Sequence, residues 1–122
     1  TEKEVYSKIV GKGGFNAYLG TNDMRDVMKR VNEGDEKAAE MVDAFTFQVA
    51  KDMGSMACVL KGKVDQIIVT GGIAYNAPVI NALKERAGFI APFTVYPGED
   101  ELLALTQGAL RVLNGEEKAM EY

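Results

Sequence analysis

The chain has 122 residues, of which 47% are hydrophobic and 26% are charged, and its formal net charge is −4. This composition is typical of one ordinary globular domain, and the acidic balance argues against a nucleic acid or an anionic membrane surface as the partner. There is no histidine and only one cysteine, Cys58, so this stretch contains no Ser-His-Asp triad, Cys-His dyad or internal disulfide. We expect Cys58 to be a buried small side chain. No apolar run reaches the roughly 18 residues of a membrane span and no secretory signal opens the chain, so we expect a cytoplasmic protein.

Residues 1–34 are expected to form a leading segment. Residues 2–10 have the pattern of the end of a helix, which the glycines of residues 11–14 stop. The "GKGG" string is not a Walker A loop, because Lys12 precedes no Ser or Thr, and we interpret it as a helix stop followed by a turn. Residues 15–19 alternate weakly between apolar and polar and predict a short extended segment.

Two helices are predicted next. The first is capped by one of Thr21, Asn22 and Asp23 and ended by Gly34. Its apolar residues recur at i, i+3, i+4 and i+7: Met24, Val27, Met28 and Val31. Asp35 caps the second, a long helix that Gly62 ends. We interpret its apolar stripe as core: Ala38, Val42, Phe45, Val49, Met53, Met56 and Leu60.

The rest of the chain alternates strands and helices. Residues 64–70 predict a buried strand, residues 77–87 a helix, and residues 93–96 a second buried strand. The helix in the crossover makes the two strands parallel. A last helix opens at residues 98–100 and ends at Gly115, and we expect one face of it to point inward: Leu102, Leu103, Thr106, Ala109, Leu110 and Leu113.

The fold class predicted by this order is α/β, with a long helix followed by β-α-β-α. Two strands buried on both faces would leave two open sheet edges, which is not a stable architecture alone. We therefore expect the sheet to be incomplete in this chain, with its other strands in sequence outside it. Residues 35–115 are the expected core unit, and residues 116–122 are a charged tail.

A Gly-Gly pair stands where the first strand meets the following helix. Gly71 and Gly72 have no Cβ, so a base, a ribose or a phosphate can approach the main chain at the carboxyl end of the sheet. Asn76 can cap the helix and also reach a polar ligand. The same residues also suit a plain strand-to-helix turn, and the spacing alone leaves both interpretations open.

Three separated segments resemble the butyrate kinase branch of the acetokinase family. The segment "IIVTGGIAYN" resembles its adenosine-binding motif, and Ala74-Tyr75 replaces the Gly-Glu of the acetate kinase form T-[AG]-G-I-G-E-N. "GGFNAYLGTNDMRDV" resembles the segment before the long helix of the family, and "YPGEDELLALTQGALRVLNGEE" resembles its carboxyl end. The resemblance covers nearly the whole chain, which is similar to roughly the last third of such an enzyme.

The resemblance implies part of a ribonuclease H-like domain, of the superfamily that joins acetate and sugar kinases, heat-shock ATPases and actin. Two such domains clasp a nucleotide. The implied reaction transfers the γ-phosphoryl group of ATP to butanoate, or to a related short or branched-chain fatty acid, with Mg²⁺. The acid pocket and the catalytic His and Arg would lie outside this chain, so we expect it to be inactive alone. Self-association into a homo-oligomer is also implied.

The resemblance also assigns site residues. Asp23, Met24 and Arg25 match an Asp-x-Arg motif beside the adenine and ribose, and the positions around the adenosine and α-phosphate are matched by Gly71, Gly72, Ile73 and Asn76. Asp100 or Glu101 would carry the acidic residue associated with the metal. From the residues alone, Asp23 could be only a helix cap, Arg25 only a surface charge, and the acidic cluster only a partner of the helix dipole.

Two alternatives remain open. One is an acetate or propionate kinase of the same superfamily, against which Tyr75 argues because it stands where that form has Glu. The other is a non-enzymatic helical interaction domain that recruits a partner or a second copy through its exposed strand edges.

Overall fold

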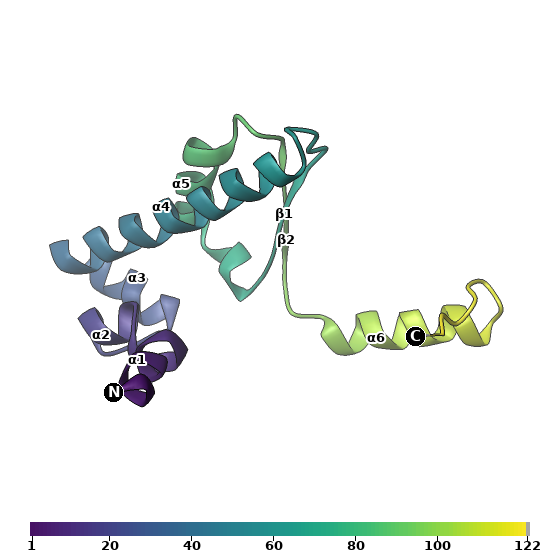
Figure 1. The fold of residues 1–122 in the computed structure, drawn as a ribbon, viewed down its shortest axis with the longest axis horizontal. Coiled ribbons are helices and arrows are strands. Elements are labelled where there is room, and N and C mark those ends of the chain that lie inside the picture. The colour runs from purple at the N-terminus through teal and green to yellow at the C-terminus, as the bar shows by residue number, and fades with distance from the viewer. Residues whose placement is uncertain (122) are drawn as a thin grey trace.

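The computed structural model describes residues 1–121 as a mixed α/β structure (Figure 1). In chain order the elements are α1 (Glu2–Ser7), the π-helical turn η1 (Lys8–Lys12), α2 (Phe15–Leu19), α3 (Met24–Asn32), α4 (Glu36–Val59), β1 (Ile67–Gly71), the 3-10 turn η2 (Gly72–Tyr75), α5 (Ala77–Ala87), β2 (Phe93–Pro97) and α6 (Glu101–Leu113). None of the helices within residues 1–121 combines the length and apolarity needed to cross a bilayer.

The long helix α4 is central to the molecule, and its buried residues lie in its first half. Asp35 caps it as predicted, because its Oδ1 accepts a hydrogen bond from the Ala38 amide at 3.0 Å. Ala38 and Thr46 are fully buried, and the Thr46 hydroxyl donates to the Asp43 carbonyl at 2.9 Å. The stripe that the sequence predicted as core is therefore core near its start, where α3 and α5 pack on it.

Side chains from the leading segment fix α3 against α4. Arg30 of α3 donates through Nη1 to the Leu19 carbonyl at 2.9 Å and through Nε to Asp35 Oδ2 at 2.8 Å, so one guanidinium joins α2, α3 and the cap of α4. Val27 is fully buried between the helices. Phe15 of α2 packs on Phe45 of α4, with ring centroids 5.4 Å apart. The start of α3 is thus held at a defined place beside the rest of the fold.

The sheet has two parallel strands, β1 and β2, as the crossover predicted. Their register runs from Ile67 opposite Phe93 to Gly71 opposite Pro97. Helix α5 connects them, and its Ile80 packs in one buried cluster with Val69 of β1. The other buried residues of α5 are Val79, Leu83 and Ala87. The ion pair between Arg86 and Asp43 fastens α5 to α4. The α/β class and the incomplete sheet expected from the sequence are confirmed.

The opposite face of the sheet is open, which corrects the expectation that both strands are buried on both faces. Val69 is buried, whereas its neighbour Ile68 points the other way and is exposed, as is Tyr96 on β2. The apolar run "IIV" is what a strand covered on both sides requires. Within residues 1–121 nothing covers that second face, since α6 does not fold back over it.

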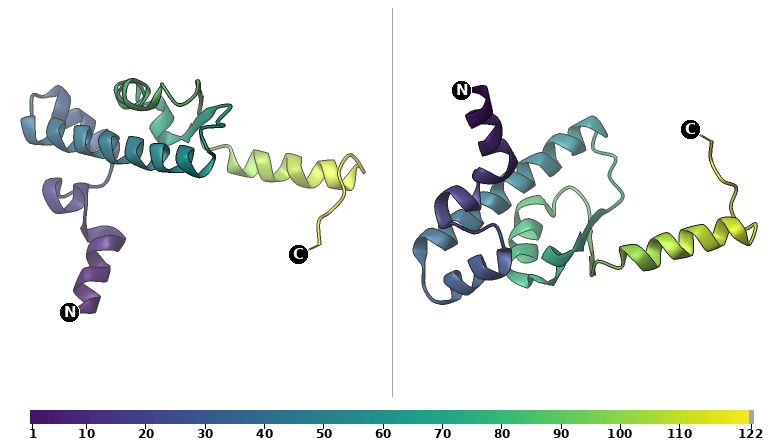
Figure 2. Two further views of the ribbon diagram at one scale, coloured as in Figure 1. Left: turned by 45° about the horizontal axis from the view of Figure 1, so that its top comes forward. Right: turned by 90° about the horizontal axis from the view of Figure 1, so that it is seen from below.

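Helix α6 lies away from the body of the fold, in the views of both Figure 1 and Figure 2. The prediction that its apolar face points inward is wrong for residues 1–121. No residue of α6 is buried, and Leu102 is 82% exposed. Helical spacing identifies an apolar face correctly but cannot say whether the surface that covers it belongs to the same stretch of chain.

Three further expectations are corrected. Phe15–Leu19 is the short helix α2, not an extended segment, because its backbone is closed by bonds such as that from the Gly20 amide to the Asn16 carbonyl at 3.1 Å. The first strand begins at Ile67, later than the predicted residue 64. The far end of α4 is exposed, including Met56 and Leu60 of the predicted core stripe and Cys58.

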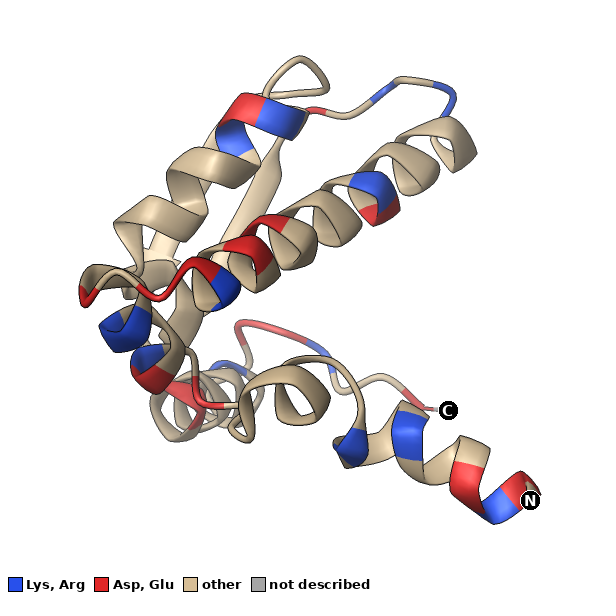
Figure 3. Ribbon diagram, turned by 90° about the vertical axis from the view of Figure 1, so that its left-hand side faces the viewer, with Lys and Arg blue, Asp and Glu red and all other residues tan. Residues whose placement is uncertain are grey.

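Charged residues are spread over the helices and not gathered by sign. Figure 3 shows Lys and Arg interspersed with Asp and Glu along the ribbon in the view that it presents. Lys29 of α3 forms an ion pair with Glu33 at 4.0 Å, and Arg111 of α6 pairs with Glu117, which follows that helix, at 3.1 Å. Such exposed pairs contribute little to stability. Most of the stability of the fold therefore comes from the apolar side chains that are buried around α4 and α5.

Replacing Val79 with Ala is expected to lower the free energy of unfolding of the 122-residue chain by about 1.5–3 kcal/mol, because Val79 is fully buried and the change leaves a void. Val59→Ala is the matched control, since Val59 is 70% exposed and its loss should change stability by less than about 0.5 kcal/mol. Urea titration followed by circular dichroism measures both. Equal losses for the two variants would contradict the burial described here.

Candidate functional site

A cleft of about 1040 Å³ lies between the start of α3 and the junction of β1 with α5. Its size is at the upper end of the roughly 300–1,000 Å³ usual for small-molecule sites. Three stretches of chain, far apart in sequence, form its walls: Asn22, Asp23, Met24, Arg25, Met28 and Asn32; Gly72, Ile73, Tyr75, Asn76, Ala77 and Pro78; and Gly98 with Glu99. All three of the segments singled out in the sequence thus meet at this one cleft.

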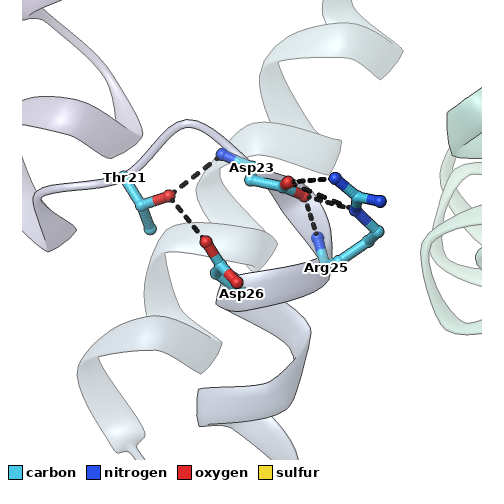
Figure 4. A network of polar contacts seen from close by, with 4 residues as sticks. All are labelled: Thr21, Asp23, Arg25 and Asp26. Carbon is cyan, nitrogen blue, oxygen red and sulfur yellow. Dashed lines mark hydrogen bonds and ion pairs between the residues drawn. The ribbon is translucent and has the colours of Figure 1, made fainter.

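Asp23 and Arg25 form a compact ion pair on the first wall (Figure 4). Asp23 is the cap of α3, because its Oδ1 accepts from the Arg25 amide at 2.9 Å. The Arg25 guanidinium donates to the same carboxylate through Nη2 at 2.6 Å and through Nε at 3.0 Å. The carboxylate is 34% exposed and the guanidinium 90% exposed, so the cation reaches open space beside the cleft.

The ion pair sets the charge of this wall. The Arg25 side chain, followed by its backbone amide, lowers the pKa of Asp23 from its ordinary 3.8 to about 2. Hydrogen bonding to Asp23 in turn raises the pKa of Arg25. Both groups are therefore fully charged at neutral pH, and the guanidinium keeps unused donors for an incoming acceptor.

Thr21 holds the turn that precedes α3. Its hydroxyl oxygen accepts from the Asp23 amide at 3.2 Å, and its hydroxyl donates to Asp26 Oδ2 at 3.2 Å (Figure 4). Of the three candidate caps in the sequence, Asp23 is the one whose side chain closes the helix, while Thr21 supports it. The first wall is thus fixed before any ligand arrives.

The two glycines at the end of β1 are needed for different reasons. Gly71 has φ +77°, a conformation that other residues rarely adopt, and its amide donates to the Gly98 carbonyl at 3.1 Å. A Cβ on Gly72 would lie 3.2 Å from Glu99 Oε1, and the Gly72 amide donates to the same oxygen at 3.2 Å. Gly71 therefore makes the turn, and the absence of a Cβ at Gly72 leaves room for the Glu99 carboxylate beside the main chain.

The second wall combines apolar and polar side chains. Ile73 is half-buried, and Tyr75, an aromatic residue of the cleft wall, is 71% exposed. Asn76 caps α5 as predicted, because its Oδ1 accepts from the Val79 amide at 3.3 Å, while the residue also borders the cleft. Met24 and Met28 face this wall from α3. An apolar slot with a few polar groups at its edge suits a flat ring that carries polar substituents.

The cleft includes most of the predicted nucleotide residues but not all of them. Asp23, Met24, Arg25, Gly72, Ile73 and Asn76 border it, whereas Gly71 does not. Gly71 lines a neighbouring hollow of about 360 Å³ that shares Gly98 and Glu99 with the cleft.

The predicted metal residues, Asp100 and Glu101, lie in that smaller hollow and not in the cleft. Within residues 1–121 no group of three or more His, Cys, Asp or Glu side chains is arranged to hold a metal ion. The two exposed carboxylates nevertheless offer the hard oxygen donors that Mg²⁺ takes, and this ion is usually held by one or two carboxylates together with phosphates and waters. The donor set fits such a shared site.

Sequence reasoning missed several residues of the cleft. Met28 follows Met24 by four positions and so shares its helix face, but in the sequence it indicated only the apolar periodicity of the helix. Tyr75 lies inside the Gly-Gly motif itself. Glu99 gave only a weak signal as one of three consecutive acidic residues, because its place in the cleft depends on the pairing of Gly71 with Gly98.

The Asp23 carboxyl is expected to titrate near pH 2 in the folded chain, as followed by carbon-13 NMR. Its folded pKa is below the unfolded value, so its contribution to stability is complete above about pH 4 and is lost as the pH falls through about 2. Arg25→Ala should move the midpoint up toward 3.8, whereas Lys29→Ala, on the same helix, should leave it in place. An Asp23 midpoint near 3.8 in the unaltered chain would disprove the pairing.

Comparison with known proteins finds relatives that match the chain along nearly its whole length. The chain is 57% identical over all 122 residues to a probable butyrate kinase of Clostridium botulinum and 59% identical to butyrate kinase 1 of Clostridium acetobutylicum. It is also 50% identical over 120 residues to a probable butyrate kinase of Coprothermobacter proteolyticus. In each case it spans 34% of the relative's length. Residues 1–97 match the acetokinase family, and the chain therefore belongs to that family.

Proposed function

We propose that the protein to which this chain belongs is a carboxylate kinase that transfers the γ-phosphoryl group of ATP to butanoate or a related short or branched-chain fatty acid, giving an acyl phosphate and ADP. This chain supplies one half of the adenosine site. The observation that carries the proposal is the meeting of the Asp23–Arg25 segment and the Gly72–Asn76 segment on one cleft, in a chain whose relatives are named butyrate kinases.

The walls of the cleft divide the recognition of the nucleotide between them. Met24 and Ile73 offer apolar surface to the two faces of the base. Asp23 accepts hydrogen bonds from ribose hydroxyls or from the adenine amino group, and the free edge of the Arg25 guanidinium donates to a phosphate or stacks on the base. Gly72 lets the ribose or the α-phosphate approach the main chain, and the amide of Asn76 adds a polar contact.

Mg²⁺ would be held by Asp100, with Glu101 as the second candidate, together with the phosphates of the nucleotide; when bound it neutralises phosphate charge. The contribution of this chain to the reaction is to bind and orient the nucleotide, since phosphoryl transfer depends mainly on positioning and charge neutralisation. The carboxylate substrate and the groups that act on the γ-phosphoryl would be bound by sequence outside this chain.

Arg25→Ala in the full-length protein is the variant that tests this proposal. It should weaken ADP binding roughly tenfold in calorimetry, because one charge-assisted hydrogen bond is lost. Lys29→Ala removes a positive charge from the same helix outside the cleft and should leave the affinity nearly unchanged. Equal effects of the two variants, or no ADP binding by the unaltered protein, would refute the proposal.

The 122-residue chain alone should form no acyl phosphate from butanoate and ATP, because half of a nucleotide site neither aligns the acid nor neutralises the transferred group. A hydroxamate assay of the purified chain measures this, with the full-length protein as the positive control. Robust acyl phosphate formation by the chain alone would refute the proposal that the acid and the γ-phosphoryl group are bound by sequence outside this chain.

Acetate or propionate is the alternative acid. Tyr75 favours the butyrate branch, because it replaces the Glu of the acetate kinase motif at a position that borders the cleft. The acid that gives the full-length protein its highest kcat/KM distinguishes the two substrates.

A non-enzymatic interaction domain is a second candidate function, which the exposed leucines of α6 favour. It predicts no thermal shift of the protein with ADP and Mg²⁺, whereas the kinase proposal predicts stabilisation by the nucleotide. Self-association through such exposed apolar surface is compatible with either function, and we propose a cytoplasmic homo-oligomer, whose mass sedimentation can measure.

A further inference from the structure

Only one of the three consecutive acidic residues after β2 faces the cleft. Glu99 borders both the cleft and the adjoining hollow, whereas Asp100 and Glu101 line the hollow alone. Two hydrogen bonds determine where Glu99 lies. The Gly71 amide donates to the Gly98 carbonyl at 3.1 Å and so fixes the neighbouring main chain, and the Gly72 amide donates to Glu99 Oε1 at 3.2 Å.

Glu99 differs from the other acidic residue of the cleft in its charge balance. The charge of Asp23 is neutralised by Arg25, whose Nη2 lies 2.6 Å from Asp23 Oδ2. Within residues 1–121 no Lys or Arg forms an ion pair with Glu99, whose carboxylate is bonded only to a neutral main-chain amide. The edge of the cleft formed by Gly72, Gly98 and Glu99 therefore carries a negative charge that no Lys or Arg of the described residues pairs.

We propose that Glu99 is a specificity-determining residue that makes the cleft prefer the Mg²⁺ complex of a nucleoside diphosphate or triphosphate over the free nucleotide. The inference rests on the proposed function of the cleft. A free polyphosphate beside Gly72 meets the unpaired charge of Glu99 at close range and is repelled. A divalent cation on the phosphates reduces that repulsion, so the penalty applies mainly to the metal-free ligand.

This role needs the charge of Glu99 and not its hydrogen bond. The side chain of Gln has the same length, and its carbonyl oxygen can still accept from the Gly72 amide. Glu99→Gln therefore removes the charge while it keeps the contact. Glu85→Gln is the matched control, since Glu85 is an exposed residue of α5 that does not border the cleft and the change in net charge is the same.

The test compares three ligands by calorimetry in the full-length protein and in both variants: adenosine, ADP with a chelator, and ADP with Mg²⁺. We expect Glu99→Gln to tighten the binding of metal-free ADP by about five- to tenfold, the effect of one partly screened like charge. Its effect on ADP with Mg²⁺ should be less than about twofold, and adenosine binding should not change. Glu85→Gln should leave all three affinities unchanged.

Three results would overturn the inference. Unchanged affinity for metal-free ADP in Glu99→Gln would show that the charge of Glu99 does not affect nucleotide binding. Weaker binding of ADP only in the presence of Mg²⁺ would make Glu99 a metal ligand, and weaker binding of adenosine would make it an acceptor for the ribose. Failure of the proposed function is distinguishable, because the unaltered protein would then bind none of the three ligands.

Discussion

The packing of the long helix α4 is the constraint on which the candidate site depends. Its first turns hold α3 through the buried Val27 and Ala38 and through the contact of Arg30 with Asp35. Farther along, it holds α5, fastened by Arg86 and Asp43. Because one rigid helix positions both neighbours, the cap of α3 lies opposite the turn that follows β1. Neither wall of the cleft would have a defined partner without it.

The parallel pairing of β1 and β2 supplies the third wall. Parallel strands end at the same edge of a sheet, so the Gly-Gly turn after β1 and the Gly98–Glu99 segment after β2 emerge together. The bond from the Gly71 amide to the Gly98 carbonyl then brings the two segments into contact. The carboxylate of Glu99 is in this way placed beside the main chain of Gly72, whose amide it accepts from.

Local patterns predicted the elements well and their surroundings less well. The helix over Ala77–Ala87, the cap at Asp35 and the parallel strands followed from spacing, capping residues and the length of the crossover. The short helix α2 did not, because five residues with two glycines before them and one after give too weak a periodic signal. The exposure of α6 and of Ile68 could not be predicted either, since an apolar face does not say which chain covers it. Most of the predicted adenosine residues border the cleft, yet Glu99 depended on a long-range pairing that no local pattern encodes.

The most direct measurement of the central claim is photolabelling of the full-length protein with 8-azidoadenosine diphosphate, followed by peptide mapping. A purine bound in the cleft predicts adducts within residues 22–32 and 72–78, which ordinary ADP prevents. Saturable labelling confined to other parts of the protein would contradict the claim that the adenine base binds in this cleft.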